Sequence, residues 1–369
     1  MKNVLFITSS AAAGGGPRQI VSWLEALKSH AMSGDVQSHL EIFVALPRQG
    51  IFSKQIAQYA SAIFFLPERK LSIWSCFGLI FFAKKNRIDY VHSFGRAGGL
   101  YGRFLGLMGI KVFHTPQGLL SGGLKQIFFN FIERVLRPFT YRYVFNSLSE
   151  VDMGYKLFKA SGGVVIPPVI EPPLCYGETC NAETFEGRDA PIVVGFMGRL
   201  VKDKRALSLV RCFKDMPKKF HLTIYGDGPE LNEIKLIAHE SEGRIKVLDF
   251  TDRWSALSEL DIFTSWSKFE SFGIAVSEAM ALGIPCLLSD VSGHRDLAGI
   301  NLDYAWLFRA ENDMSDYELS VSFKKIFGEM LLQNEDRLKR AKSAQMEIRR
   351  LCNPTKIAED LFSEYYPRK

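Results

Sequence analysis

The sequence has no apolar run long enough to cross a lipid bilayer. Its longest apolar stretch, LSIWSCFGLIFFA at residues 71–83, falls short of the roughly 20 residues that a membrane-spanning helix needs. The VLFI near the start is too short for the apolar core of a secretory signal peptide, which takes about 7–15 residues. We therefore expect a cytoplasmic chain without a transmembrane helix.

Cysteine is scarce, and so is excess charge. Of the six cysteines in 369 residues only Cys175 and Cys180 lie close together, and no second pair completes a zinc-type site. Unpaired thiols in a reducing compartment are the expected state. The formal charge of +6 falls short of the basic stripe that nucleic-acid binding needs. It suits anionic small molecules, such as nucleotide phosphates, or an anionic membrane surface.

Several nucleotide-binding signatures are also missing. No stretch matches G-x-G-x-x-G or G-x-x-x-x-G-K-[ST], so dinucleotide oxidoreductases and P-loop proteins lose their main support. No D-x-D pair is present to suggest a metal-bridged diphosphate site. We expect no metal and no organic cofactor.

The sequence does contain short apolar runs that alternate with helical patterns. The same alternation starts again in the second half of the chain. NVLFIT, LEIFVAL, DYVHS and KVFHTP in the first half, and IVVGFMG, FHLTIYGDGP, IKVLDF, DIFTSW and PCLLSD in the second, predict buried parallel strands. The expected fold class is α/β, with two Rossmann-like doubly wound parallel-sheet domains that face a cleft. We place the first domain at residues 1–170, a linker rich in proline, glycine and polar residues at 171–190, and the second domain at 191–350. A C-terminal helix at 351–369 is expected to pack back on the first domain.

Two loops have the composition of phosphate-binding turns. SSAAAGGGPRQ places Gly15 and Gly16 between the first strand and the first helix, where backbone amides can approach an anion. A plain connector is the alternative. GFMGRLVKDKRALSLV places Arg199 and Lys204 between a strand and the next helix. Two such cations could neutralise a diphosphate leaving group without a metal, although a solvated basic loop would read the same way.

The stretch SKFESFGIAVSEAMALGIPCLLSD carries two glutamates at the beginning of a helix. The first-turn amides of Phe272, Gly273 and Ile274 lack intrahelical partners and suit a diphosphate or sugar oxygens. Glu270 can then reach sugar hydroxyls, and the two oxygens of Glu278 can accept both ribose hydroxyls. The alternative reading makes Glu270 an N-cap residue and Glu278 a surface charge.

Taken in order, these segments resemble glycosyltransferase family 4. GRLVKDK, IYGDGPE and FESFGIAVSEAMALGIP are similar to the family motifs G-R-L-x-x-x-K-G, G-x-G-P and E-G-F-G-x-x-x-x-E-A-M-A-x-G-x-P. In the first half, DYVHSFGRAGGLYGR and HTPQG resemble D-I-V-H-x-H-x-x-x-A-G-x-x-G-R and H-T-P-H-G. FIERVL and VFNSLSEVD resemble the family's acidic helix and its S-E-x-E segment. The resemblance covers most of the chain and implies a retaining enzyme with the GT-B fold, of the bacterial surface-polysaccharide type.

The resemblance also implies roles for individual residues. Arg199 and Lys204 would hold the donor diphosphate, and Glu270 would contact the transferred sugar, which makes these three the catalytic candidates. The implied donor-binding set, which covers the ribose, the phosphates and the base, is Gly15, Gly16, Leu248, Phe272, Gly273, Ile274 and Glu278.

Some positions depart from the family pattern. Arg205 and Ser271 replace glycines of the two C-terminal motifs. Gln117 stands where H-T-P-H-G has its second histidine, near the reacting sugar. Either Gln117 keeps a hydrogen bond to a sugar hydroxyl or His114 takes over that contact. VIPPVIEPP lacks the N-G that usually follows V-I-P in the family.

The favoured hypothesis is a glycosyltransferase that moves a hexose or N-acetylhexosamine from a nucleoside diphosphate sugar, most simply a UDP-sugar. The implied acceptor is a glycan, in particular a lipid-linked glycan of O-antigen, capsule or exopolysaccharide synthesis. A sugar-nucleotide epimerase or a phosphorylase of the same architecture is one alternative, and a non-catalytic sugar-nucleotide-binding subunit is another.

Two segments bear on contact with a membrane. IWSCFGLIFFAKKNR and KQIFFNFIERVLRPFTYRYVF mix aromatic with basic residues, a pattern that can lie on the anionic inner face of the plasma membrane. Buried helices with charged ends are the alternative reading.

Overall fold

The computed structural model describes residues 2–12, 14–32, 40–119, 124–176, 185, 188–249 and 252–365. The chain divides into two compact units, one formed by residues 1–169 with 352–369 and the other by residues 170–351. Cys180, Phe250 and much of the expected linker lie outside the described residues. The cysteines within them are free thiols: Cys76, Cys175, Cys212, Cys286 and Cys352. Among the described helices, none combines the length and the apolar character needed to cross a membrane.

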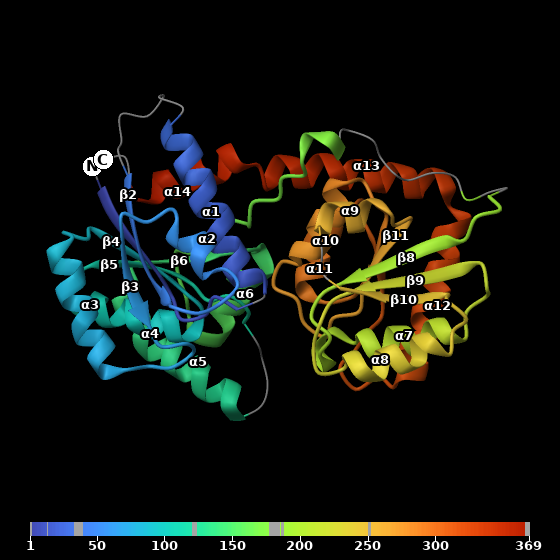
Figure 1. Cartoon of the computed structure of the whole chain (residues 1–369), viewed down its shortest axis with the longest axis horizontal. Coiled ribbons are helices and arrows are strands. Elements are labelled where there is room, and N and C mark those ends of the chain that lie inside the picture. The colour runs from blue at the N-terminus through green and yellow to red at the C-terminus, as the bar shows by residue number, and fades with distance from the viewer. Residues whose placement is uncertain are drawn as a thin grey trace. The chain divides into compact units, whose positions relative to one another are not determined.

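The first unit is built on a seven-stranded parallel sheet in the order β3-β2-β1-β4-β5-β6-β7 (Figure 1). Its strands are β1 (Lys2–Thr8), β2 (Leu40–Pro47), β3 (Ala62–Leu66), β4 (Tyr90–Phe94), β5 (Lys111–Thr115), β6 (Arg142–Phe145) and β7 (Val164–Val165). Its helices are α1 (Gly15–Met32), α2 (Ser53–Ala57), α3 (Ile73–Lys85), α4 (Gly95–Gly106), α5 (Leu124–Leu136), α6 (Leu148–Phe158) and α14 (Pro354–Tyr365).

Strand β1 shows why the apolar runs become central strands. Val4 and Phe6 pack into a core with α1 and α14, whereas Leu5 and Ile7 pack into a second core with α3 and α4 on the opposite face. Because both faces of the sheet are covered, its strands are apolar throughout rather than alternating. The strands are in parallel register, with Val4 opposite Tyr90 of β4.

The last helix, α14, is part of the first unit and packs against α1 (Figure 1). Its final residue, Tyr365, is buried, and the hydroxyl lies 2.7 Å from Nδ1 of His92 in β4. The other ring nitrogen of His92 lies 2.9 Å from the Thr115 hydroxyl. Burial lowers the pKa of His92 to about 3, so this buried imidazole is neutral at physiological pH.

The second unit contains a six-stranded parallel sheet in the order β10-β9-β8-β11-β12-β13. Its strands are β8 (Ile192–Met197), β9 (Phe220–Tyr225), β10 (Ile245–Leu248), β11 (Ile262–Ser265), β12 (Cys286–Ser289) and β13 (Trp306–Phe308). Its helices are α7 (Ala206–Lys214), α8 (Leu231–His239), α9 (Arg253–Ser258), α10 (Ile274–Ala281), α11 (Ser292–Ala298), α12 (Asp316–Leu332) and α13 (Asn334–Leu351).

Both sheets are therefore doubly wound, which confirms the predicted α/β class. In the second unit the strand order reverses between β8 and β11. Ligands of open parallel sheets bind outside the carboxyl ends of the strands at such a reversal. The loops that follow β8 and β11 are thus the first place to look for a site.

Candidate active site

The loop after β8 carries Arg199 and is held by close backbone contacts. A Cβ at Gly226, just after β9, would come within 1.9 Å of the Gly198 carbonyl oxygen. A Cβ at Gly228 would lie 2.4 Å from the Leu200 carbonyl oxygen. The G-x-G-P motif therefore uses its glycines to pack against the loop that presents the exposed Arg199 side chain.

Lys204 ends a short 3-10 turn, η3 (Lys202–Lys204), between β8 and α7. The next residue, Arg205, has a φ of 52°, in the left-handed region where glycine is favoured. This explains the glycine of the family motif at that position. Here the Arg205 guanidinium holds the turn instead, because it donates hydrogen bonds to the carbonyls of Ala310, at 3.0 Å, and Glu311.

Glu270 meets Lys204 across the carboxyl edge of the second sheet. The Lys204 ammonium donates to Oε2 of Glu270, and the Ser267 hydroxyl donates to the same oxygen at 3.3 Å. Burial raises the pKa of Glu270, but Lys204, His294 and Ser267 together outweigh it and hold the pKa below its ordinary value. The two side chains thus form an ion pair at neutral pH that is still partly open to solvent.

Helix α10 begins without a side-chain cap. Its N-cap residue is Gly273, with a φ of 84°, so the alternative reading of Glu270 as the N-cap is wrong. In contrast, the N-cap of α9 is Asp252, whose carboxylate accepts hydrogen bonds from first-turn amides. Within the part of the chain that the structure describes, no backbone carbonyl accepts from the amides of Phe272, Gly273 or Ile274. The first-turn amides of α10 can therefore donate to an anion beside the Lys204–Glu270 pair.

Glu278 lies in α10 and is buried, so it is not the surface charge of the alternative reading. One carboxylate oxygen lies 3.0 Å from Nε of Arg253, the first residue of α9. The contact of Arg253 with Glu278 could not be predicted from the sequence, because nothing in the local pattern of Arg253 points to α10. Leu248 ends β10, at the edge of the same sheet, and is partly exposed.

In the first unit the glycine turn and Gln117 lie together. Gln117 follows β5, has a φ of 54°, and donates from its side-chain amide to the Gly16 carbonyl at 3.2 Å and to Gln19 Oε1 at 3.4 Å. A Cβ at Gly16 would come within 2.6 Å of the Gln117 side chain. A larger residue at position 16 would therefore displace the Gln117 side chain from this contact. Gly15, the first residue of α1, precedes it.

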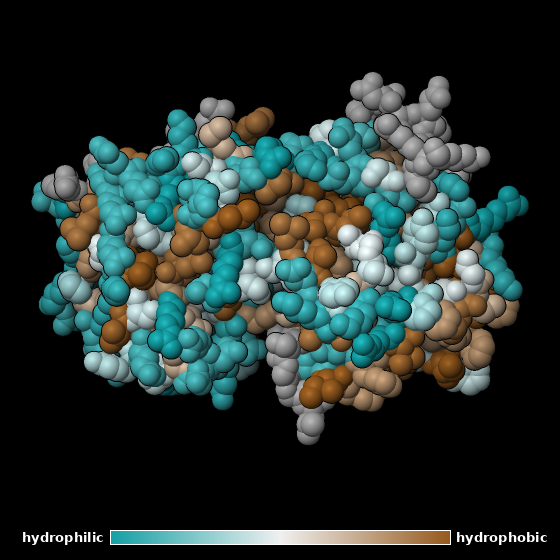
Figure 2. Space-filling model, turned by 180° about the vertical axis from the view of Figure 1, so that it is seen from behind, coloured by the Kyte–Doolittle hydropathy of each residue, from teal (hydrophilic) through white to brown (hydrophobic). Residues whose placement is uncertain are grey.

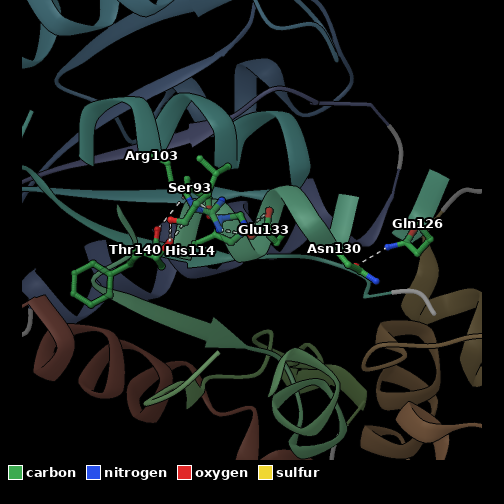
Figure 3. A network of polar contacts seen from close by, with 9 residues as sticks. Ser93, Arg103, His114, Gln126, Asn130, Glu133 and Thr140 are labelled. Atoms are coloured by element: carbon green, nitrogen blue, oxygen red, sulfur yellow. Dashed lines mark hydrogen bonds and ion pairs between the residues drawn. The ribbon is translucent and has the colours of Figure 1, made fainter. Parts of the chain in front are cut away.

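His114 lies in a buried polar network of the first unit (Figure 3). Its Nδ1 is 3.0 Å from the Ser93 hydroxyl, and Arg103 of α4 donates to Glu133 of α5 close by, at 2.5 Å. Burial and the nearby Arg103 hold the pKa of His114 well below its ordinary value. The Nε2 atom of His114 lies 3.9 Å from a carboxylate oxygen of Glu133, so the imidazole faces this network, which does not fit the expectation that His114 contacts the reacting sugar. Of the two candidates, only Gln117 keeps a partly open side chain.

The structure therefore brings together Lys204, Glu270 and the start of α10, and separately Gly16 and Gln117. Three residues of the second unit were missed from sequence: Ser267, Arg253 and His294. His294 lies in the SGHRDL segment, and none of the motif positions falls on it.

Comparisons with known proteins show what this chain is similar to. Residues 182–316 match the family described as Glycosyl transferases group 1. The chain covers all of the crystal structure of Anabaena HepE in complex with UDP and glucose, with a TM-score of 0.79 at 15% identity. It also shares its fold with the lipopolysaccharide outer core galactosyltransferase WaaB, with a TM-score of 0.67, 19% identity and 99% of each chain covered. The family match covers less than half of the chain, and the structural matches show the GT-B fold.

Two relatives from Escherichia coli are more similar in sequence. The O-antigen biosynthesis glycosyltransferase WbnH is 26% identical over 301 residues, which cover 79% of this chain and 82% of WbnH. The O-antigen biosynthesis glycosyltransferase WclY is 34% identical over 116 residues, which cover 30% of this chain and 33% of WclY.

Proposed function

We propose that the chain is a retaining glycosyltransferase of family 4 that transfers a hexose or N-acetylhexosamine from a UDP-sugar to a glycan hydroxyl. The observation that carries this proposal is the Lys204–Glu270 ion pair beside the uncapped start of α10. A cation and free helix amides suit a diphosphate, and an ionised carboxylate suits sugar hydroxyls. The UDP and glucose in the HepE structure support the choice of donor.

In the proposed reaction the acceptor oxygen attacks the anomeric carbon from the side of the leaving group. The bond from that carbon to the phosphate oxygen breaks, and the departing diphosphate takes the proton of the acceptor hydroxyl. Arg199, Lys204 and the amides of α10 would stabilise the charge that develops on the diphosphate. Glu278 would hold the ribose, and the backbone near Leu248 would meet the base. No metal is assigned a role.

A donor screen tests this proposal directly. We expect a UDP-sugar to raise the melting temperature of the protein more than the matching GDP- or dTDP-sugars, both with and without EDTA. Ligand that binds only the folded state stabilises it by about 2.7 kcal/mol at a hundred times its dissociation constant. No shift with any nucleotide sugar would contradict the proposal, and a shift that EDTA abolishes would contradict metal independence. Product analysis with a UDP-sugar alone excludes an epimerase if the sugar is recovered unchanged.

For the acceptor we propose a lipid-linked glycan of surface-polysaccharide synthesis. The O-antigen glycosyltransferases among the relatives support this choice. One of them, WbnH, is similar to this chain over most of its length. A lipid-linked acceptor would place the protein on the inner face of the plasma membrane. The surface of the first unit offers a candidate contact.

Two helices of the first unit expose an apolar stripe rather than burying it. In α3 the stripe is Trp74, Phe77 and Phe81, of which Trp74 is 81% exposed. In α5 it includes Phe128 and Phe131. Figure 2 shows apolar residues along the lower right edge, where these helices lie in that reversed view. The exposure of both stripes argues against the alternative reading of ordinary buried helices.

Basic side chains adjoin both stripes. Lys84 and Lys85 are exposed at the end of α3, and Arg134 and Arg137 are exposed at the end of α5 and just after it. Aromatic residues beside lysine and arginine suit the interface of an anionic bilayer. We propose that this surface binds the membrane.

Vesicle flotation tests the membrane surface. The wild-type protein should float at low salt with vesicles of phosphatidylglycerol and phosphatidylethanolamine, and less with phosphatidylcholine alone. Reversing Lys84 and Lys85 to Glu should weaken binding at least about 30-fold, because each basic residue near the surface contributes about 1 kcal/mol. Leu236→Ala, at an exposed apolar residue of α8, is the control and should change nothing. A wild-type protein that fails to float at low salt would exclude this surface as a membrane contact.

A further inference from the structure

Among the described residues, His294 is a buried histidine in which one ring nitrogen has no hydrogen-bond partner. It lies in α11, directly after the residue that packs on the Glu270 loop, and its side chain is fully buried. Nδ1 lies 2.8 Å from the Ser289 carbonyl oxygen and 3.1 Å from the Ser289 hydroxyl. Within the described chain, the enclosed Nε2 has no hydrogen-bond partner. A buried polar atom without a partner is costly, so its presence next to a binding site calls for a ligand group.

The hydrogen bonds around Ser289 determine which nitrogen carries the proton. The Ser289 hydroxyl donates to the Ser267 carbonyl at 2.7 Å, so its own hydrogen is already used. Both oxygens of Ser289 that face His294 are therefore acceptors, and Nδ1 must be the donor. Burial lowers the pKa of His294 to about 4, although Glu270 raises it, so the ring is neutral at physiological pH. Nε2 then carries a lone pair and can only accept a hydrogen bond.

His294 lies close to the Lys204–Glu270 pair, because both charges act on its imidazole. A Cβ at Gly293 would lie 2.4 Å from the Glu270 carbonyl oxygen, so the start of α11 is in tight contact with the Glu270 loop. Because Nδ1 is bonded to Ser289 at the end of β12, Nε2 is the ring nitrogen that remains for a ligand. The charged groups that act on the imidazole are Glu270, Lys204 and Asp290. Asp290 is itself paired with Arg295 on the surface.

We propose that His294 is a specificity-determining residue, whose Nε2 accepts a hydrogen bond from a hydroxyl of the same sugar that Glu270 contacts. This inference rests on the proposed glycosyltransferase function. Glu270 and neutral His294 would form a pair of acceptors for neighbouring hydroxyls, and Lys204 would remain the only cation among the three. A donor whose sugar lacks the hydroxyl facing Nε2 would leave that nitrogen unpaired and would bind more weakly.

The test compares binding of UDP with binding of UDP-sugars by calorimetry. His294→Asn can keep the donor to Ser289, since the asparagine amide nitrogen reaches the Nδ1 position, but it removes Nε2. His239→Asn, at an exposed histidine of α8, is the matched control. The ligands are UDP, UDP-glucose, UDP-galactose, UDP-N-acetylglucosamine and UDP-N-acetylgalactosamine.

We expect all three proteins to bind UDP equally, and His294→Asn to bind the preferred UDP-sugar about tenfold more weakly. Equal loss for UDP and the UDP-sugar, or no loss, would overturn the inference, because a structural role would not separate the two ligands. If the wild-type protein binds neither UDP nor any UDP-sugar, the proposed function fails first, and the inference fails with it.

A second measurement uses deoxy-sugar donors, and its first part needs only the wild-type protein. One deoxy version of the preferred UDP-sugar should bind the wild-type protein about tenfold more weakly than the parent sugar. The same deoxy donor should bind His294→Asn as well as the parent does, because the contact is already absent. An equal loss in both proteins for every deoxy donor would assign the contact to another residue and overturn the inference.

Discussion

Replacing Lys204 with alanine should lower kcat/KM for sugar transfer by about 10²–10³-fold, the usual effect of removing one group that stabilises developing charge. The variant loses the cation proposed to face the leaving diphosphate and also the ion-pair partner of Glu270. Steady-state kinetics with the donor identified by the thermal screen would measure the loss. Lys202→Ala is the matched control, because Lys202 lies in the same turn but is exposed and should leave kcat/KM unchanged.

The pH profile of the Lys204→Ala variant distinguishes loss of charge from collapse of the loop. Lys204 is the largest of the influences that hold the pKa of Glu270 down against burial. Without it, burial should raise that pKa, so the residual activity should fall as pH drops below neutrality while wild-type activity does not. In the wild-type fold the lowered pKa means that ionised Glu270 adds stability above its unfolded pKa, and this is lost as pH falls through the folded pKa. Wild-type turnover in the variant would contradict the assignment of Lys204.

Much of the fold can be predicted from the sequence, because a strand that is buried on both faces of a sheet is a continuous apolar run. The strands at the centre of each sheet, such as β1 and β8, are continuous apolar runs and were predicted. The missed strands are β3, β6, β7 and β13, which are shorter or lie toward the edges of the sheets. β7 has two residues and β13 has three, too few for any periodicity to show.

The candidate site was predictable only where one motif positions the residue. The C-terminal motifs, which have fixed spacings, marked Arg199, Lys204 and Glu270. In the structure all three follow strands of the second sheet at its carboxyl edge. Contacts between segments that lie far apart in the chain leave no motif in the sequence. The contact between Gln117 and Gly16 joins the loop after β5 to the start of α1, and the two residues lie 101 positions apart in the chain. The burial of His114 likewise depends on α4 and α5, which the motif around it does not contain.

The ion pair between Arg103 and Glu133 should contribute strongly to the stability of the first unit. The Arg103 side chain is fully buried; its Nε donates to the Thr140 hydroxyl at 3.0 Å and another nitrogen donates to Glu133 at 2.5 Å (Figure 3). Glu133→Ala leaves a buried guanidinium without its counter-charge. We expect the free energy of unfolding of this unit to fall by about 3–5 kcal/mol, measured by urea titration.

Removing both charges of the Arg103–Glu133 pair should lower the free energy of unfolding less than removing the Glu133 charge alone. The double variant Arg103→Met with Glu133→Met fills similar volume and leaves no unpaired charge, so it should be more stable than Glu133→Ala. Asp360→Ala breaks the half-exposed pair with Lys356 in α14 and should cost less than about 1 kcal/mol. If Glu133→Ala cost no more than Asp360→Ala, the Arg103 guanidinium would have found other partners. The pair would then not be a main contribution to the stability of the first unit.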